Sequence, residues 1–275
     1  GNQPSRSRNQ LVLDFTRSDV VDYVFDAVSK VLTGNDISYV KWDMNRGVTD
    51  AYSSELASDE QGEFYHRYML GVYDLADRLT KVFPDVFFEG CASGGGRFDA
   101  GMLYYFPQIW TSDDTDAYER TRVQWGTATC YPQSAMSCHV SACPNHQTRR
   151  VTPLHTRGVV ASLGPTGYEL DPTKLTDEEV GEVASQIREY EKVADLILKG
   201  DSYRLCSPFD GNYFVQMIVS KDKKQAYVCG VRIHGVPCDY DNFVALAGLS
   251  EGLTYRIEEL DITASGKALT TIGVR

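Results

Sequence analysis

Residues 37–43 read ISYVKWD, a short strand-like run that follows the helix-breaking segment Gly34-Asn35-Asp36. Apolar residues at helical spacing flank this run on both sides, over residues 18–32 and over residues 64–82. The spacing therefore predicts a helix, a strand and a second helix in succession.

The alternation of strand and helix continues outward from this run. We expect further strands at Leu11–Phe15, Val86–Gly90 and Ile109–Ser112, and helical segments near Trp125 and over 154–160. Strands that alternate with helices favour parallel βαβ units, arranged either as a barrel or as an open doubly wound sheet.

The pattern changes near residue 200. Residues Thr176 to Glu179 form a capping box that begins a helix, and Gly200 ends it. Residues 213–219 and 225–231 then have the pattern of two short strands, and a charged turn lies between them. This arrangement predicts an antiparallel hairpin. We expect an α/β portion over residues 1–199 and a small antiparallel β-sandwich over residues 200–275.

Composition excludes several classes of protein. The 275 residues are 42% hydrophobic and 24% charged, which is typical of a globular chain and not of a disordered or fibrous one. The 27 Lys and Arg against 38 Asp and Glu give a net charge of −11, and that charge repels phosphate backbones and anionic membranes. We therefore expect a small neutral or cationic partner, with no nucleic acid and no membrane.

Cysteine usage and hydropathy indicate the compartment. The seven cysteines form no C-x-x-C pair, which disfavours both a disulfide framework and a structural zinc site and predicts reduced thiols in the cytoplasm. No apolar run approaches the length of a membrane span. Because residues 1–10 are polar and run directly into a strand pattern, we expect the natural amino terminus to lie upstream.

Polar residues close the strand at 39–43. The period of two places Tyr39, Lys41 and Asp43 on one face, and it turns Val40 and Trp42 toward the helices. Lys41 is expected to keep Asp43 ionised, and an ionised carboxylate beside a cation suits a nucleophile. The alternative is a structural Lys–Asp pair at a strand end.

A second acidic group closes the strand that begins at Ile109. Asp113, Asp114 and Asp116 crowd one loop, where mutual repulsion is expected to keep one carboxyl protonated as a general acid. An ionised acid together with a protonated one is the machinery of glycosidic bond cleavage. The alternative is an acidic loop that caps the following helix through Asp116.

The loop at 91–97, CASGGGR, lies between the two acidic strand ends. It lacks both the G-K-[ST] of a phosphate loop and the G-x-G-x-x-G of dinucleotide folds, so an open loop against a sugar ring fits better. Trp42 and Trp110 are candidates to stack on the sugar, or else core residues. The histidines and cysteines between 138 and 155 match no zinc spacing, so we expect no metal.

Three motifs resemble the α-galactosidases of glycoside hydrolase family 36: YVKWDMNR at 39–46, EGCASGGGRFD at 89–99 and WTSDDTD at 110–116. The resemblance implies a (β/α)8 TIM-type barrel, incomplete here because its first strands are missing, followed by the β-sandwich. By the same resemblance Asp43 is the nucleophile and Asp113 the general acid/base. It also implies that the galactose ring is surrounded by Arg8, Lys41, Cys91 and Gly94.

The implied reaction is retaining hydrolysis of terminal α-galactose from raffinose- or melibiose-type oligosaccharides, without a cofactor. A transferase of the raffinose-synthase type and an inactive fragment that only binds sugar or protein remain open as alternatives. Family members are longer, so the resemblance covers their C-terminal portion, with Leu11–Phe15 as the third barrel strand. It also implies a homo-oligomer in the full-length protein.

Overall fold

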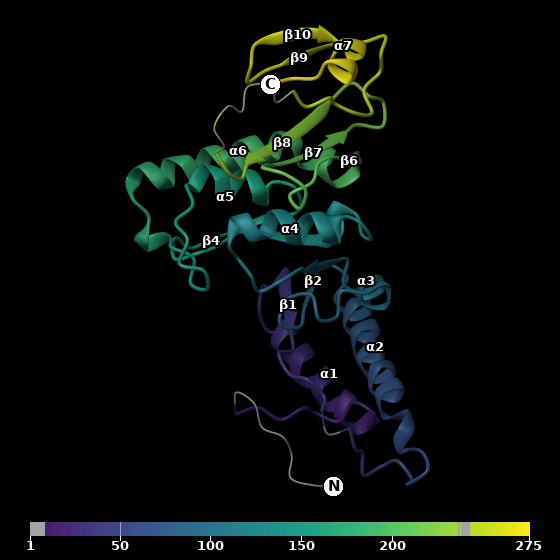
Figure 1. The fold of residues 1–275 in the computed structure, drawn as a ribbon. Coiled ribbons are helices and arrows are strands. Elements are labelled where there is room, and N and C mark those ends of the chain that lie inside the picture. Colours follow the sequence, from purple (N-terminus) through teal and green to yellow (C-terminus); the bar gives the residue numbers. More distant parts are fainter. Residues whose placement is uncertain (1–8, 50, 236, 238–242) are drawn as a thin grey trace. The chain divides into compact units, whose positions relative to one another are not determined.

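The computed structural model describes residues 9–49, 51–235, 237 and 243–275 (Figure 1). The chain divides into two compact units, Gly1–Asp113 and Asp114–Arg275. The first unit consists of α1 (Ser18–Thr33), β1 (Tyr39–Asp43), the 3₁₀ turn η1 (Gln61–Glu63), α2 (Phe64–Val82), β2 (Phe87–Cys91), α3 (Ala100–Tyr105) and β3 (Gln108–Trp110). Strand β1 pairs in parallel with β2, and β2 pairs in parallel with β3.

The core of the first unit forms between α2 and the parallel strands. The predicted stripe on α2 is confirmed, because Phe64, Tyr68, Val72, Leu75 and Leu79 are all buried. Burying each such side chain contributes roughly 1.5–3 kcal/mol, so this stripe holds the helix on the sheet. From β1, only Val40 and Trp42 join the same cluster, as the period of two predicted.

The predicted strand at Leu11–Phe15 is wrong. No described residue pairs with this segment as a strand, and Leu11 and Leu13 are 53% and 50% exposed. The Asp14 carboxylate accepts hydrogen bonds from the Thr16 amide at 3.1 Å and the Thr16 hydroxyl at 2.6 Å. These bonds turn the chain directly into α1, so the local apolar pattern is overridden.

The second unit contains more elements, several of which pack along one side of the long helix α6 (Figure 1). They are α4 (Ala117–Thr127), η2 (Gln133–Ala135), β4 (Met136–Ser141), α5 (Leu154–Ala161), β5 (Thr166–Glu169), η3 (Pro172–Lys174), α6 (Asp177–Lys199), β6 (Asp201–Cys206), β7 (Tyr213–Val219), β8 (Ala226–Arg232), β9 (Thr254–Ile257), β10 (Ile262–Ser265) and α7 (Gly266–Thr271). Strands β4 and β5 are parallel, whereas β6, β7 and β8 form an antiparallel sheet and β9 pairs with β10 in antiparallel fashion.

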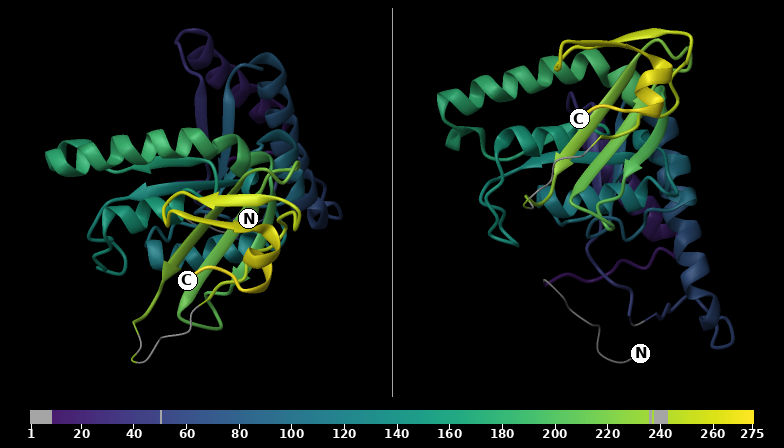
Figure 2. Two further views of the ribbon diagram at one scale, coloured as in Figure 1. Left: turned by 90° about the horizontal axis from the view of Figure 1, so that it is seen from above. Right: turned by 45° about the horizontal axis from the view of Figure 1, so that its top comes forward.

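Strand β7 is the centre of the antiparallel part and is buried on both faces. Phe214 and Ile218 pack against Ile197 of α6, while Met217 and Val219 pack on the opposite side in a cluster with residues of α7 and β9. Figure 2 shows β9 and β10 lying across one face of the β6–β7–β8 sheet. The predicted hairpin is confirmed by the register of β7 with β8, and a domain boundary at residues 199/200 stays a prediction.

Helix α6 begins as the sequence predicts. The Glu179 amide donates to the Thr176 hydroxyl at 3.2 Å, and the Thr176 amide donates back to the Glu179 carboxylate at 2.9 Å. This capping box satisfies two amides that the helix itself leaves without partners, and Gly200 stands at the C-cap.

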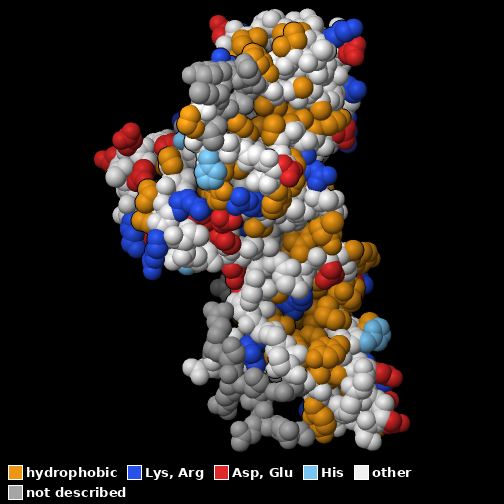
Figure 3. Space-filling view, in the orientation of Figure 1, with side chains coloured by type: hydrophobic (Ala, Val, Ile, Leu, Met, Phe, Trp, Pro, Cys, Tyr) orange, Lys and Arg blue, Asp and Glu red, His pale blue; other side chains and the backbone are white. Residues whose placement is uncertain are grey.

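The surface carries charges of both signs. Lys, Arg, Asp and Glu side chains are interspersed over the face drawn in Figure 3, so the net charge of −11 is not gathered there into one acidic patch. Among the described residues, none of the helices combines the length and the apolar character that crossing a membrane requires.

Candidate active site

Asp43 and Cys91 stand together at the carboxyl ends of neighbouring strands. In the parallel register of β1 with β2, Asp43 pairs with Cys91 and Lys41 pairs with Glu89. The Met44 amide then donates to the Cys91 carbonyl at 3.2 Å, which continues the alignment past the last strand residue. The carboxyl ends of parallel strands are where α/β folds place their chemistry.

The Cys91 thiol connects four of the predicted site residues. Burial raises the pKa of this thiol to about 12. The Asp43 carboxylate beside the thiol contributes to this rise, whereas the Gly94 N–H and the Lys41 charge act in the opposite direction. The Cys91 thiol is therefore uncharged at neutral pH and is not a nucleophile.

Trp110 connects Lys41 to Asp113. The Lys41 ammonium lies over the Trp110 ring, 4.9 Å from its centroid, and the indole Nε1 donates to the Asp113 carboxylate at 3.2 Å. Trp110 is only 2% exposed, and Trp42 packs into the core beside Phe106. The sequence left two roles open for these tryptophans, stacking on a sugar or packing in the core, and the structure favours packing in the core.

Gly94 holds the 91–97 loop against the segment that carries Asp113. Its φ of +82° lies in the left-handed region, and it forms an antiparallel bridge with Ser112. A Cβ at this position would lie 2.6 Å from the Ser112 Cα and 2.7 Å from the Asp113 amide nitrogen. Only glycine allows so close an approach of the two backbones.

The two carboxylates face solvent at the same edge of one sheet. Asp43 ends β1 and Asp113 follows β3, and both side chains are exposed. One strand lies between β1 and β3, so their backbones are about 10 Å apart, twice the spacing of neighbouring strands. Two acids in this position can act on a ligand that lies across the end of β2.

Asn45 belongs to the same cluster, although the sequence reasoning missed it. Its Nδ2 donates to the Asp43 Oδ2 at 2.6 Å, and its Oδ1 accepts from the Ser93 amide at 2.8 Å and the Ser93 hydroxyl at 3.1 Å. The available signal was the period of two, because Lys41, Asp43 and Asn45 continue one face beyond the end of the strand.

Comparison with known proteins decides the family. Residues 1–200 match the melibiase family, and residues 213–275 match the glycosyl hydrolase family 36 C-terminal domain. The chain belongs to the melibiases of glycoside hydrolase family 36.

Two curated family 36 proteins illustrate the similarity. Alpha-galactosidase Mel36A of Lactobacillus acidophilus is 46% identical over 99% of this chain and 37% of its own length. Alpha-galactosidase AgaA of Geobacillus stearothermophilus is 50% identical over 95% of this chain and 36% of its own length. The chain thus spans little more than a third of these relatives.

The solved structures agree with the described fold. The crystal structure of AgaA matches 99% of this chain and 38% of its own chain, with a TM-score of 0.96 at 49% identity. Variants of AgaA have been solved in complex with raffinose and with stachyose. The expected fold class, an incomplete TIM-type barrel followed by an antiparallel β domain, is confirmed.

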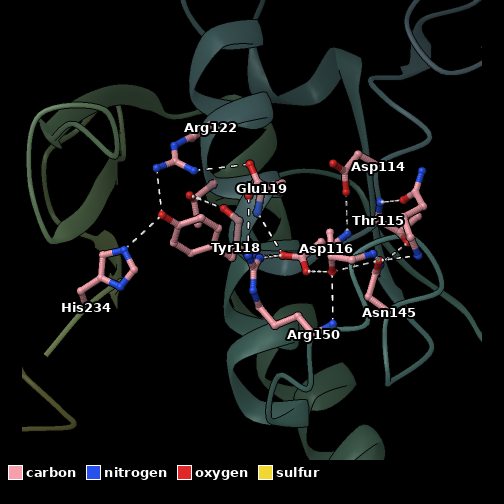
Figure 4. Close-up of polar contacts among 12 residues, drawn as sticks. Asp114, Thr115, Asp116, Tyr118, Glu119, Arg122, Asn145, Arg150 and His234 are labelled. Atoms are coloured by element: carbon pink, nitrogen blue, oxygen red, sulfur yellow. Dashed lines mark hydrogen bonds and ion pairs between the residues drawn. The ribbon is translucent and has the colours of Figure 1, made fainter.

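The acidic loop of this family 36 chain also has a structural member, shown in Figure 4. The fully buried Asp116 carboxylate is the N-cap of α4 and accepts from the Tyr118 and Glu119 amides at 2.9 and 3.2 Å. Thr148 donates to it at 2.5 Å, and Arg150 forms an ion pair with it. Burial alone would raise the pKa of Asp116, but these hydrogen bonds and Arg150 lower it below its ordinary value. The capping role considered for Asp116 is confirmed.

The sequence also predicted that the histidines hold no metal ion and that Arg8 lies near the sugar. His139 bonds through Nδ1 to the Glu169 carboxylate at 2.7 Å and through Nε2 to the Ser137 hydroxyl at 2.9 Å. Within the described ranges, no three His, Cys, Asp or Glu side chains are grouped to hold a metal ion. Arg8, expected near the galactose ring, lies outside the described residues.

Proposed function

We propose that the protein containing this chain is a retaining α-galactosidase that removes terminal α-galactose from raffinose- and melibiose-type oligosaccharides. The observation that carries this proposal is the pair Asp43 and Asp113 at one sheet edge, with Lys41, Cys91 and Gly94 around them. The raffinose and stachyose complexes of the AgaA variants support this class of substrate.

The first step transfers the galactosyl group to the protein. Asp43 attacks the anomeric carbon, the bond from that carbon to the leaving oxygen breaks, and the proton of Asp113 passes to that oxygen. The Cys91 thiol, whose pKa is raised mainly by burial, stays neutral beside the nucleophile during this attack.

The second step releases galactose. Water attacks the anomeric carbon, Asp113 takes its proton, and the bond to Asp43 breaks with the electron pair returning to the carboxylate. Two inversions leave the product with the α configuration of the substrate. If the acceptor is a sugar in place of water, the same residues perform transfer, so transfer is one outcome of the test below.

The location and assembly of the protein are also proposals. All six cysteines that the structure describes are free thiols, which supports a reducing, cytoplasmic compartment. We expect the full-length protein to form a homo-oligomer, as the family resemblance implies.

The test follows p-nitrophenyl α-D-galactoside by NMR with the full-length protein and its Asp43→Asn variant. We expect α-galactose as the first product and a loss of at least about a thousand-fold in kcat/KM in the variant. A matched control is Asp36→Asn, which changes an exposed carboxylate in the turn before β1 and should leave the rate unchanged. β-Galactose as the first product, or full activity of Asp43→Asn, would overturn the mechanism. Dominant transfer at high sucrose concentration would favour the transferase, and no turnover by a folded parent would favour a binding module.

A further inference from the structure

We propose that Asn45 is the positioning residue of the nucleophile Asp43, an inference that rests on the proposed function. Asn45 lies two residues beyond the last residue of β1, on the face that carries Lys41 and Asp43. Its amide joins the nucleophile to the 91–97 loop, which belongs to the neighbouring strand β2.

The two ends of the Asn45 side chain have different partners. Oδ1 accepts both from the Ser93 amide and from the Ser93 hydroxyl, so this end is the oxygen. Nδ2 is thereby directed at Asp43, to whose Oδ2 it donates at 2.6 Å. Ser93 has a φ of 51°, which is rare for a residue with a side chain. That conformation precedes Gly94, so the same turn both orients Asn45 and approaches Ser112.

This hydrogen bond distinguishes the two oxygens of Asp43. With Oδ2 held by Asn45, Oδ1 is the oxygen that attacks the anomeric carbon. In the resulting ester Oδ2 is the carbonyl oxygen, and it regains negative charge as the bond between Oδ1 and the anomeric carbon breaks. The Asn45 N–H stabilises that charge, as a donor placed where charge develops does. Asn45 therefore assists the departure of Asp43 in the second step more than its attack in the first.

Three variants of the full-length protein separate this role from a structural one. Asn45→Ala removes both hydrogen-bonding ends. Asn45→Asp keeps an acceptor for Ser93 but removes the donor toward Asp43. Ser93→Ala removes only the hydroxyl donor and keeps the backbone amide. Asn35→Ala is the matched control, because Asn35 is an exposed residue whose amide donates to the Val31 carbonyl at the end of α1.

The assay is the release of nitrophenol from p-nitrophenyl α-D-galactoside, whose good leaving group speeds the first step, so a variant impaired in the second step accumulates the galactosyl ester. For Asn45→Ala we expect kcat to fall by about 100-fold, kcat/KM to fall much less, and a pre-steady-state burst of nitrophenol to appear. Asn45→Asp should not restore kcat, and Ser93→Ala should lose less kcat than Asn45→Ala because it keeps the backbone amide that orients Asn45, whereas Asn35→Ala should stay within about threefold of the parent. The thermal unfolding midpoint of each variant is measured to verify that the variant is folded at the temperature of the assay.

Three results would overturn the role of Asn45 alone. The first is an Asn45→Ala variant that keeps the kcat of an active parent. The second is an Asn45→Asp variant with the parental kcat. The third is an Asn45→Ala variant in which kcat and kcat/KM fall equally and no burst appears. A folded parent that does not hydrolyse the galactoside would instead overturn the proposed function, and the role of Asn45 with it.

Discussion

Asp43 and Cys91 are register partners on neighbouring parallel strands, and the Asp43 carboxylate is one of the groups that raise the pKa of the Cys91 thiol. The thiol is buried and its pKa is raised to about 12, so it stays protonated at neutral pH. A thiol that is uncharged at neutral pH thus stands beside the proposed nucleophile.

This environment predicts that Cys91 resists alkylation. Thiolates react with iodoacetamide and thiols do not, so Cys91 should be modified far more slowly at pH 8 than the exposed Cys130 and Cys143. Peptide mapping by mass spectrometry measures the three rates in one sample. Labelling of Cys91 as fast as Cys130 would contradict the burial and the raised pKa described for it.

Gly94→Ala should disturb both stability and activity. The substitution forces a side chain into the left-handed region and places its Cβ 2.6 Å from the Ser112 Cα, so unfolding free energy should fall by about 2 kcal/mol or more. Because the Asp113 amide lies at 2.7 Å, kcat/KM should fall as well. Gly126→Ala is the control, since nothing lies within 4 Å of its added Cβ inside α4 and it should be neutral or stabilising. Equal urea midpoints for the two variants would contradict this account.

Much of the fold was predictable because its signals are local. The α2 stripe from Phe64 to Leu79 and the capping box at Thr176 depend only on residues within a few turns of one helix. The charged turn between β7 and β8 likewise determines that hairpin by itself.

The strands that were predicted wrongly or missed depend on their neighbours. Leu11–Phe15 has a strand-like pattern, but Asp14 turns the chain and no described strand pairs with the segment. Conversely, β5 has little apolar character, and its pairing with β4 is what makes it a strand. The contacts that define a parallel strand come from distant parts of the chain.

The residues of the site also divide into those with a local sequence signal and those that depend on distant parts of the chain. Asp43 and Asp113 could be found because acids that close apolar strands are conspicuous and because their motifs resemble a known family. Asn45 is uncharged and follows the end of the strand, and its partner Ser93 is 48 residues away in the chain. Only the register of β1 with β2 brings that pair together.

Asp116→Asn should weaken the protein in a pH-dependent way. Asparagine still caps α4, but the charge that pairs with Arg150 is lost, so unfolding free energy at pH 7 should fall by about 1–3 kcal/mol. The pKa of Asp116 is lowered in the fold, so its contribution is present above the unfolded value near 3.8 and is lost as the pH falls through the lower folded value. The difference between parent and variant should therefore shrink below pH 4 in urea titrations. Asp195→Asn, which removes an exposed ion pair with Lys199, should change stability by under about 0.5 kcal/mol.

Alkaline pH should destabilise the second unit. Burial raises the pKa values of the Cys229 thiol and the Tyr227 phenol to about 12, from ordinary values of 9.0 and 10.0. Both groups bind their protons more tightly in the fold, so stability falls as the pH rises from about 9 toward 12. Urea unfolding at pH 8 and pH 10 should show this fall, and Cys229→Ala should show a smaller one, although it starts from a lower stability because it leaves a cavity. Identical falls in the parent and in Cys229→Ala would contradict the assignment to Cys229.

The roles of Asp43 and Asp113 can be separated by chemical rescue with azide on p-nitrophenyl α-D-galactoside. Azide fills the space left by Asp43→Gly and attacks once, so we predict β-galactosyl azide from that variant. In Asp113→Ala, azide attacks the galactosyl ester of Asp43, so we predict α-galactosyl azide. NMR of the two products is the most direct test of a double displacement with Asp43 as nucleophile and Asp113 as acid/base. The same anomer from both variants, or no rescue of either folded variant, would contradict it.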